Sequence, residues 1–487
     1  MKGMKKMGRL NKKSILLAAF SLLLMLVLAA CNSSQAEESQ PMDTGLDPNE
    51  FLNTAFKDQF PLQWESYMRN MVNENEVISK SDPSIEPYLP ALWSGYGFSL
   101  EYNLTRGHTY ALEDQINIAR VNDNTGGSCV TCKSSVVPLL LTEDEFGEDF
   151  WAANFRGEVL PRIEELGAPG VHDELGEWGH VSIGCSDCHN PQTMDLRITR
   201  PSFTRAMERK GVDLSQATQN DMRSYVCAQC HVEYYFDAEN HEVTFPWDNG
   251  LRVENIYEYK QTTAKDQGFD YDWIHKISGT PSLKAQHPEF ELSSYGPHAT
   301  AGVSCADCHM PYQRVDGKKK VSSHRWGSPL ETIQESCTTC HGDKTPTQLE
   351  NRVKDIQDRH KVALLEAQEL NTVAHYYVNR MITAGVPQEK IEEAQERIRK
   401  AQWFWDFIAA ENSYGFHNPD GSIDAFRTSS IESQAAIVLA TEELSKLGED
   451  IDELKRQIEI TMEAIVNEED PFEKHKHATN EWFPAQN

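Results

Sequence analysis

Cys129-Val130-Thr131-Cys132-Lys133 is the first of five Cys-x-x-Cys motifs in this chain, and a lysine follows its second cysteine. A histidine takes that place in the other four motifs, which are Cys185/Cys188/His189, Cys227/Cys230/His231, Cys305/Cys308/His309 and Cys337/Cys340/His341. Cys-x-x-Cys-His is the attachment signal of c-type haem. Its thiols form thioethers with the porphyrin, and its histidine ligates the iron. The sequence therefore predicts five haem c groups, with Lys133 as the exceptional axial ligand.

The cysteine count supports haem attachment. Ten of the eleven cysteines lie in the five motifs and the eleventh is Cys31, so none remains for a disulfide. Structural zinc is the alternative, because paired Cys-x-x-Cys motifs also bind zinc. Five motifs would leave one without a partner, and zinc gives no reason for the histidine after four of them.

Composition limits the classes of partner. The chain has 487 residues, enough for more than one domain, and a formal net charge of −29. Nucleic acid is not expected as a partner, because phosphate binding needs clustered lysine and arginine. Only 39% of the residues are hydrophobic, which fits a core in which porphyrins replace part of the side-chain packing.

Residues 1–31 have the pattern of a lipoprotein signal peptide. Six lysines and arginines precede an apolar run over residues 15–30, as in a secretory signal. Leu28-Ala29-Ala30-Cys31 resembles a bacterial lipobox, so Cys31 is expected to become the lipidated first residue. An uncleaved membrane anchor is the alternative, but a full span needs about 20 apolar residues and this run is shorter. We expect an extracytoplasmic protein tethered to the membrane through Cys31.

The rest of the chain divides into three parts by composition. Residues 32–48 are polar, which predicts a flexible tether. Residues 49–345 hold the five motifs, separated by segments rich in Gly, Pro and Asn, and predict a pentahaem domain of short helices and long loops. Residues 346–487 have helical apolar spacing, with helices expected over 348–381, 388–412, 422–447 and 450–466. The predicted fold is mainly α, a haem-packed multihaem cytochrome c fold followed by a bundle of long helices.

Lys133 marks the first haem as chemically different. An amine ligates a metal only when deprotonated, against an ordinary pKa of about 10.4, so metal binding must drive proton release. The axial ligand is a recognised control on haem reactivity. The alternative is that Lys133 replaces a lost histidine at a haem that has no role in the reaction. As the single exception among five otherwise regular motifs, Lys133 favours a functional role. We therefore expect the Lys133 haem to react and the other four to transfer electrons.

The motif set is similar to that of the pentahaem cytochrome c nitrite reductase family, which forms ammonium from nitrite. One Cys-x-x-Cys-Lys with four Cys-x-x-Cys-His at this spacing carries the resemblance. Further matches are Cys227-Ala-Gln-Cys-His-Val-Glu-Tyr-Tyr-Phe236, Leu283-Lys-Ala-Gln-His-Pro-Glu289, and Arg106-Gly-His-Thr109 followed by Arg120. The resemblance covers about residues 50–420.

The resemblance implies a distal pocket above the Lys133 iron, lined by Arg120, Tyr234 and His287. It also implies a nearby calcium ion, bound by the Glu233 and Gln286 side chains and by the backbone carbonyls of Tyr234 and Lys284. These are oxygen donors, which suit calcium.

The resemblance further supplies the second haem ligands, which counting among 17 histidines cannot choose. It pairs His324 with the Cys185 haem, His108 with the Cys227 haem, His417 with the Cys305 haem and His298 with the Cys337 haem. It also implies a homodimer, with a membrane-bound multihaem quinol dehydrogenase as electron donor.

The residue chemistry agrees with nitrite as substrate. In so acidic a protein the pocket must supply its own positive field, from iron, Arg120, a divalent cation and a protonated His287. His287 is also the expected proton donor, because an ordinary histidine titrates near neutral pH, and Tyr234 can donate a hydrogen bond. The alternatives are a haem-propionate partner for Arg120, packing for Tyr234 and a loop spacer for His287.

The sequence thus predicts an ammonia-forming nitrite reductase with five haem c groups and calcium. Two rival hypotheses stay open at this point. One is a non-catalytic multihaem electron carrier, in which the altered motif is incidental. The other is a reductase of another small oxygenated substrate, such as hydroxylamine, nitric oxide or sulfite.

Overall fold

The computed structural model describes residues 42–486, apart from 74–76, 83, 143, 168–173, 318 and 472. The predicted signal peptide, Cys31 and most of the predicted tether lie outside the described residues. In the part of the chain that is described, no helix combines the length and apolar composition of a membrane crossing.

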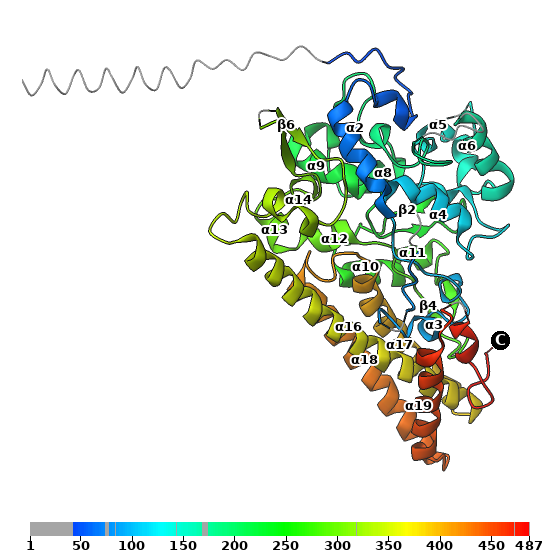
Figure 1. Ribbon diagram of the computed structural model, residues 1–487. Coiled ribbons are helices and arrows are strands. Elements are labelled where there is room, and N and C mark those ends of the chain that lie inside the picture. Colours follow the sequence, from blue (N-terminus) through cyan, green and yellow to red (C-terminus); the bar gives the residue numbers. More distant parts are fainter. Residues whose placement is uncertain are drawn as a thin grey trace, which may run out of the picture.

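The motif-bearing part of the chain consists of many short helices joined by loops (Figure 1). This confirms the predicted texture of short helices and long loops. The α-helices are α2 (Pro61–Met68), α3 (Leu89–Leu92), α4 (Ala111–Asn117), α5 (Val137–Leu140), α6 (Leu160–Leu166), α7 (Cys185–Cys188), α8 (Pro201–Arg209), α9 (Gln219–Ala228), α10 (Val253–Gln261), α11 (Thr263–Asp266), α12 (Glu289–Ser294), α13 (Pro297–Thr300), α14 (Cys305–His309) and α15 (Ile333–Ser336). The 3-10 helices of this part are η1 (Asn53–Phe56), η2 (Arg69–Asn73), η3 (Gly97–Ser99), η4 (His108–Tyr110), η5 (Gly127–Val130), η6 (Gly147–Trp151), η8 (Leu214–Gln216) and η9 (Pro329–Thr332), and η7 (Phe155–Val159) is a single π-helical turn.

Three antiparallel hairpins, which the sequence did not predict, complete this part. They are β1 (Tyr235–Phe236) with β2 (Val243–Thr244), β3 (Trp273–Ile274) with β4 (Pro281–Ser282), and β5 (Tyr312–Val315) with β6 (Lys319–Ser322). In the second hairpin Trp273 pairs with Ser282 and Ile274 with Pro281. That pairing fixes the start of the loop that carries Lys284, Gln286 and His287.

Four long helices follow, and they lie together at the opposite end of the molecule from β6 and α2 (Figure 1). They are α16 (Pro346–Thr383), α17 (Gln388–Ala409), α18 (Pro419–Lys446) and α19 (Ile451–Asn467), with the short turn η10 (Lys474–His477). The four predicted helices are confirmed within a few residues. Thr345 begins α16 with a capping box, since its hydroxyl accepts a hydrogen bond from Gln348 N and the Gln348 side chain accepts one from Thr345 N.

Helix α17 joins the two parts of the molecule. Its aromatic residues Trp403, Phe404, Trp405 and Phe407 are buried in the hydrophobic cluster of the motif-bearing part, while α16, α18 and α19 supply most of a second cluster. Trp405 packs on Trp93 of the segment after α3, with ring centroids 5.4 Å apart. The C-terminus returns to the same region, where Gln486 N donates to Lys276 O at 2.8 Å.

Candidate active site

All five Cys-x-x-Cys motifs border one cavity of about 2870 Å³. Small-molecule pockets usually enclose about 300–1,000 Å³, so this space is large enough for several big groups. The cysteines that line it are Cys132, Cys185, Cys188, Cys227, Cys230, Cys305, Cys308, Cys337 and Cys340, while Cys129 stands beside it. None of the ten forms a disulfide in the described part of the chain, so both cysteines of each motif are available for haem attachment.

Local helical turns orient the two thiols of a motif. Residues three apart lie on the same face of a helix, so both cysteines of one motif point the same way. The turn at Cys305–Cys308 is capped by Ser304, whose hydroxyl and backbone N–H both bond the Asp307 carboxylate, at 2.7 and 2.8 Å. In the Cys185 motif Gly184 N donates to Asp187 in the same way, at 2.8 Å.

The two histidines of each expected axial pair face each other, and the gap between them is similar in all four pairs. The ring centroids are 6.3 Å apart for His189 and His324, 5.8 Å for His108 and His231, 6.2 Å for His309 and His417, and 6.3 Å for His298 and His341. Metal–imidazole bonds are about 2 Å long, so each gap has room for one metal atom with a nitrogen ligand on either side.

Backbone and carboxylate acceptors hold several of these imidazoles by Nδ1. His189 Nδ1 donates to Met194 O at 2.7 Å, His324 Nδ1 to Ser322 O at 3.1 Å and His309 Nδ1 to Gly327 O at 3.2 Å. His417 Nδ1 donates to the buried Glu411 carboxylate at 3.1 Å. These bonds place the proton on Nδ1 and leave Nε2 available to a metal.

Lys133 borders the same cavity as Arg120 and His287, two residues of the expected distal pocket. Burial, reinforced by the charges of Lys133 and neighbouring histidines, lowers the pKa of His108 and of His287 to about 3. Both imidazoles are therefore neutral near pH 7. The protonated His287 expected from the sequence would therefore need a nearby anion, such as the substrate, to raise its pKa.

Tyr234 and Arg120 complete this group. The Tyr234 ring lies 5.5 Å from the His287 ring, and burial raises the Tyr234 pKa, which keeps the phenol protonated. Burial lowers the pKa of Arg120, while the phenols and Glu101 around it favour its charge. Its guanidinium lies 4.5 Å over the Phe98 ring and donates from Nη1 to Glu101 O at 3.1 Å. The structure thus brings Lys133, Arg120, Tyr234 and His287 together.

The expected calcium ligands also meet. Glu233 is fully buried, and its Oε2 accepts a hydrogen bond from Gln286 N at 2.6 Å. Its Oε1 lies 2.9 Å from the ammonium of Lys260. This buried carboxylate therefore already faces a cation, and the oxygen donors around it fit calcium. The described residues contain no group of three His, Cys, Asp or Glu side chains that would hold a metal. The expected calcium ligands do not form such a group, because Glu233 is the one carboxylate among them.

Three buried carboxylates hold the loop that leads to His287. Lys284 N donates to Asp272 at 2.8 Å, Ala285 N to Asp406 at 2.6 Å and Gln286 N to Glu233. The Lys284 ammonium adds an ion pair with Asp406 of α17, at 2.9 Å. The loop therefore depends on the long helices for its position.

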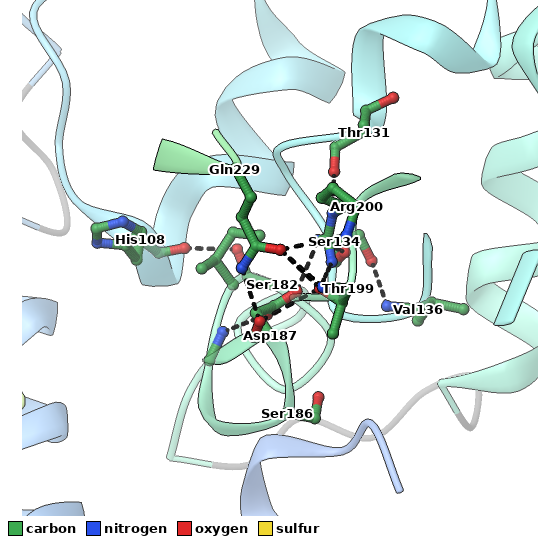
Figure 2. A network of polar contacts seen from close by, with 12 residues as sticks. His108, Thr131, Ser134, Val136, Ser182, Ser186, Asp187, Thr199, Arg200 and Gln229 are labelled. Atoms are coloured by element: carbon green, nitrogen blue, oxygen red, sulfur yellow. Dashed lines mark hydrogen bonds and ion pairs between the residues drawn. The ribbon is translucent and has the colours of Figure 1, made fainter. Parts of the chain in front are cut away.

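Sequence reasoning missed the residue that ties three motifs together (Figure 2). Arg200, which is 1% exposed, donates to Thr131 O at 2.7 Å, to Ser134 O at 2.9 Å and to Asp187 at 2.6 Å. Gln229 Nε2 donates to Asp187 O at 2.8 Å. These bonds join the segments of the Lys133, His189 and His231 motifs. Gln229 stands inside a motif and could have been considered, but no pattern marks Arg200.

Comparison with known proteins agrees with this site. Residues 53–484 match the family model described as cytochrome c552. "Cytochrome c nitrite reductase subunit NrfA" of Nitratidesulfovibrio vulgaris is 39% identical over 468 residues, which cover 88% of this chain and 86% of that protein. "Cytochrome c-552" of Bacteroides thetaiotaomicron is 36% identical, over 83% of this chain and 81% of that protein. The solved catalytic subunit NrfA of cytochrome c nitrite reductase from Desulfovibrio desulfuricans, described with two calcium sites, superposes with a TM-score of 0.74 at 38% identity, over 84% of this chain and 91% of that one.

Proposed function

Because the chain belongs to the cytochrome c552 family, that of the pentahaem cytochrome c nitrite reductases, and is thus an enzyme, we propose that it reduces nitrite to ammonium. In the balanced reaction nitrite takes up six electrons and eight protons and yields ammonium and two waters. The observation that carries the proposal is the arrangement of one lysine motif and four facing histidine pairs around one cavity. Membership of a family of enzymes argues against the alternative that this protein only carries electrons.

We assign five haem c groups to the five motifs. A haem at Cys129 and Cys132 would supply the iron that binds nitrite, and the haems at the other four motifs would deliver electrons to it. The Lys133 amine is its proposed proximal ligand. The similar gaps between His189 and His324, and between the other three pairs, support two imidazole ligands for each remaining iron.

Arg120, His287 and Tyr234 would each act on the nitrite anion in a different way. The Arg120 guanidinium, which borders the cavity, attracts the anion by electrostatics. The neutral His287 donates a hydrogen bond through a ring N–H, and binding of an anion beside it favours uptake of a proton that it can pass on. The Tyr234 phenol stays protonated and donates its O–H.

We propose that Glu233, Gln286 and the carbonyls of Tyr234 and Lys284 bind calcium when the ion is present. The description of calcium sites in the Desulfovibrio desulfuricans structure supports this assignment, as does the complete burial of the Glu233 carboxylate. The ion would add positive charge beside the pocket.

We also propose a homodimer formed through the long helices. Ile431 and Val438 of α18 are 60% and 47% exposed, and a groove of about 650 Å³ runs beside them. Ile431→Glu should shift sedimentation from dimer to monomer, because it places a charge in an apolar contact. Ile460→Glu on α19, at a position 47% exposed, is the control that should leave the mass unchanged. A wild-type protein that sediments as a monomer would refute the proposal.

The remaining proposals concern location and electron supply. We propose an extracytoplasmic lipoprotein tethered through Cys31 and reduced by a membrane-bound multihaem quinol dehydrogenase. Haem c attachment outside the cytoplasm and the lipobox sequence support the location. Globomycin, which blocks lipoprotein signal cleavage, should leave a longer precursor in cells; an unchanged mass would count against lipidation.

The reaction itself is tested with the purified protein and a reduced dye. We expect nearly one ammonium for each nitrite consumed in a sample that contains five haems per chain. Consumption of nitrite without ammonium would overturn the product assignment. Sulfite turnover far above nitrite turnover would overturn the substrate.

A further inference from the structure

Lys260 of α10 places a buried ammonium against the proposed calcium site. Its side chain and that of Glu233 are both 0% exposed, and Lys260 Nζ lies 2.9 Å from Glu233 Oε1. Lysine is almost never fully buried without a partner.

Aromatic rings form the rest of this ammonium's surroundings. Lys260 Nζ lies 5.0 Å from the ring centroid of Trp403, 5.2 Å from that of Phe269 and 5.6 Å from that of Tyr235. Ring faces attract cations, most strongly where water is excluded. This position therefore suits a cation, and the ammonium of Lys260 is the cation that occupies it.

Glu233 is the one formally charged ligand among the four proposed for calcium. The other three donors are neutral, namely the Gln286 amide and the carbonyls of Tyr234 and Lys284. Calcium binds carboxylate oxygens at about 2.3–2.6 Å. A calcium ion on Glu233 Oε1 would therefore stand within a few ångströms of the Lys260 ammonium, where two positive charges repel strongly because little water screens them.

We propose that Lys260 is a built-in cation that competes with calcium for Glu233 and holds the active-site loop when the metal is absent. The inference rests on the calcium site proposed above. Glu233 links Lys260 on α10 to Gln286 N, one residue before His287. The ammonium thus keeps Glu233 oriented, and with it the loop. Calcium can bind only if the ammonium leaves its aromatic surroundings, so the two cations weaken each other's binding.

The test compares calcium binding by haem-loaded wild-type protein and Lys260→Met after chelator treatment. Calorimetric titration with calcium chloride should show at least about tenfold tighter binding by the variant, a coupling of ordinary size between sites. The Tm of the wild type should fall less with chelator than the Tm of Lys260→Met, which should recover with calcium. Lys265→Met is the matched control, because Lys265 of the adjacent α11 pairs with Asp270 at 3.2 Å on the surface.

Equal calcium affinity in wild type and Lys260→Met would overturn the proposal, as would an equal fall of the two Tm values with chelator. If Lys260→Met does not fold, Lys260→Arg decides, because it keeps the charge. Its Tm should fall with chelator no more than that of the wild type, and a larger fall would refute the proposal. None of these readouts involves nitrite, so a failure of the proposed reaction would be recognised separately.

Discussion

At the scale of single residues, Arg200 shows how this site is assembled. Its guanidinium donates hydrogen bonds to the Thr131 and Ser134 carbonyls on either side of Lys133 (Figure 2). It also donates one to the Asp187 carboxylate inside the His189 motif. Both side chains of the ion pair are nearly inaccessible, 0% for Arg200 and 4% for Asp187. The relative placement of two haem attachment sites therefore depends on a residue that belongs to neither motif.

Arg200→Met should destabilise the protein strongly. Removing one partner of a buried ion pair leaves an uncompensated charge, which costs about 3–5 kcal/mol. Urea unfolding of the haem-loaded protein measures this. Arg359→Met is the control, since the Arg359–Asp355 pair is exposed and should contribute less than about 1 kcal/mol. Similar midpoints for the two variants would contradict the role given to Arg200.

At the scale of elements, α17 positions the active-site loop. Asp406 accepts hydrogen bonds from Ala285 N and from the Lys284 ammonium, and Arg399 of the same helix donates to Asp270 O at 2.5 Å. The hairpin β3–β4 fixes one end of the loop, and this helix fixes its middle.

Asp406→Asn should lower nitrite turnover without loss of haem. Small misplacements of pocket groups can reduce rates by about 100-fold, and a loss of at least about tenfold is expected. Lys400→Met on α17 is the control, because Lys400 pairs with Glu432 away from the loop. Steady-state kinetics per haem-loaded enzyme decides. Full turnover by Asp406→Asn would show that the loop does not need this anchor.

A stacked pair of histidines joins the β3–β4 hairpin to α16 and makes this junction sensitive to acid. The rings of His275 and His375 lie 3.8 Å apart, and Ser278 Oγ contacts His375 Nδ1 at 2.8 Å. Burial lowers the pKa of His375 to about 4 and holds that of His275 well below its usual range. Both imidazoles are therefore neutral in the folded protein at pH 7.

The sign of the pH effect follows from these lowered pKa values. In the unfolded chain the histidines take up protons below about pH 6.5, so the stability they support is complete above that pH and is lost as the pH falls toward 4. A shift from 6.5 to about 4 corresponds to about 3 kcal/mol for His375. His375→Gln should flatten the fall in Tm between pH 7 and 5. An unchanged slope would assign that fall to other groups.

At the scale of the whole molecule, much of the fold could be predicted from the sequence. The Cys-x-x-Cys spacing predicts a haem-organised body because the ligands are local, and apolar periodicity predicts the four long helices. The three hairpins were missed because two-residue strands have no period to detect. Arg200, Asp406 and Lys260 were missed because their roles depend on contacts between segments far apart in the chain. The lowered pKa of His287 was missed because burial is a property of the fold.

We propose that one lysine-ligated haem carries out the reaction while the other four haems supply it with electrons. The most direct test is nitrite-dependent ammonium formation by Lys133→His, measured per chain with five haems attached. This variant should keep its haems and lose most of its turnover, because only the axial ligand of the reactive iron has changed. Wild-type turnover by Lys133→His with all five haems in place would refute the role of the lysine.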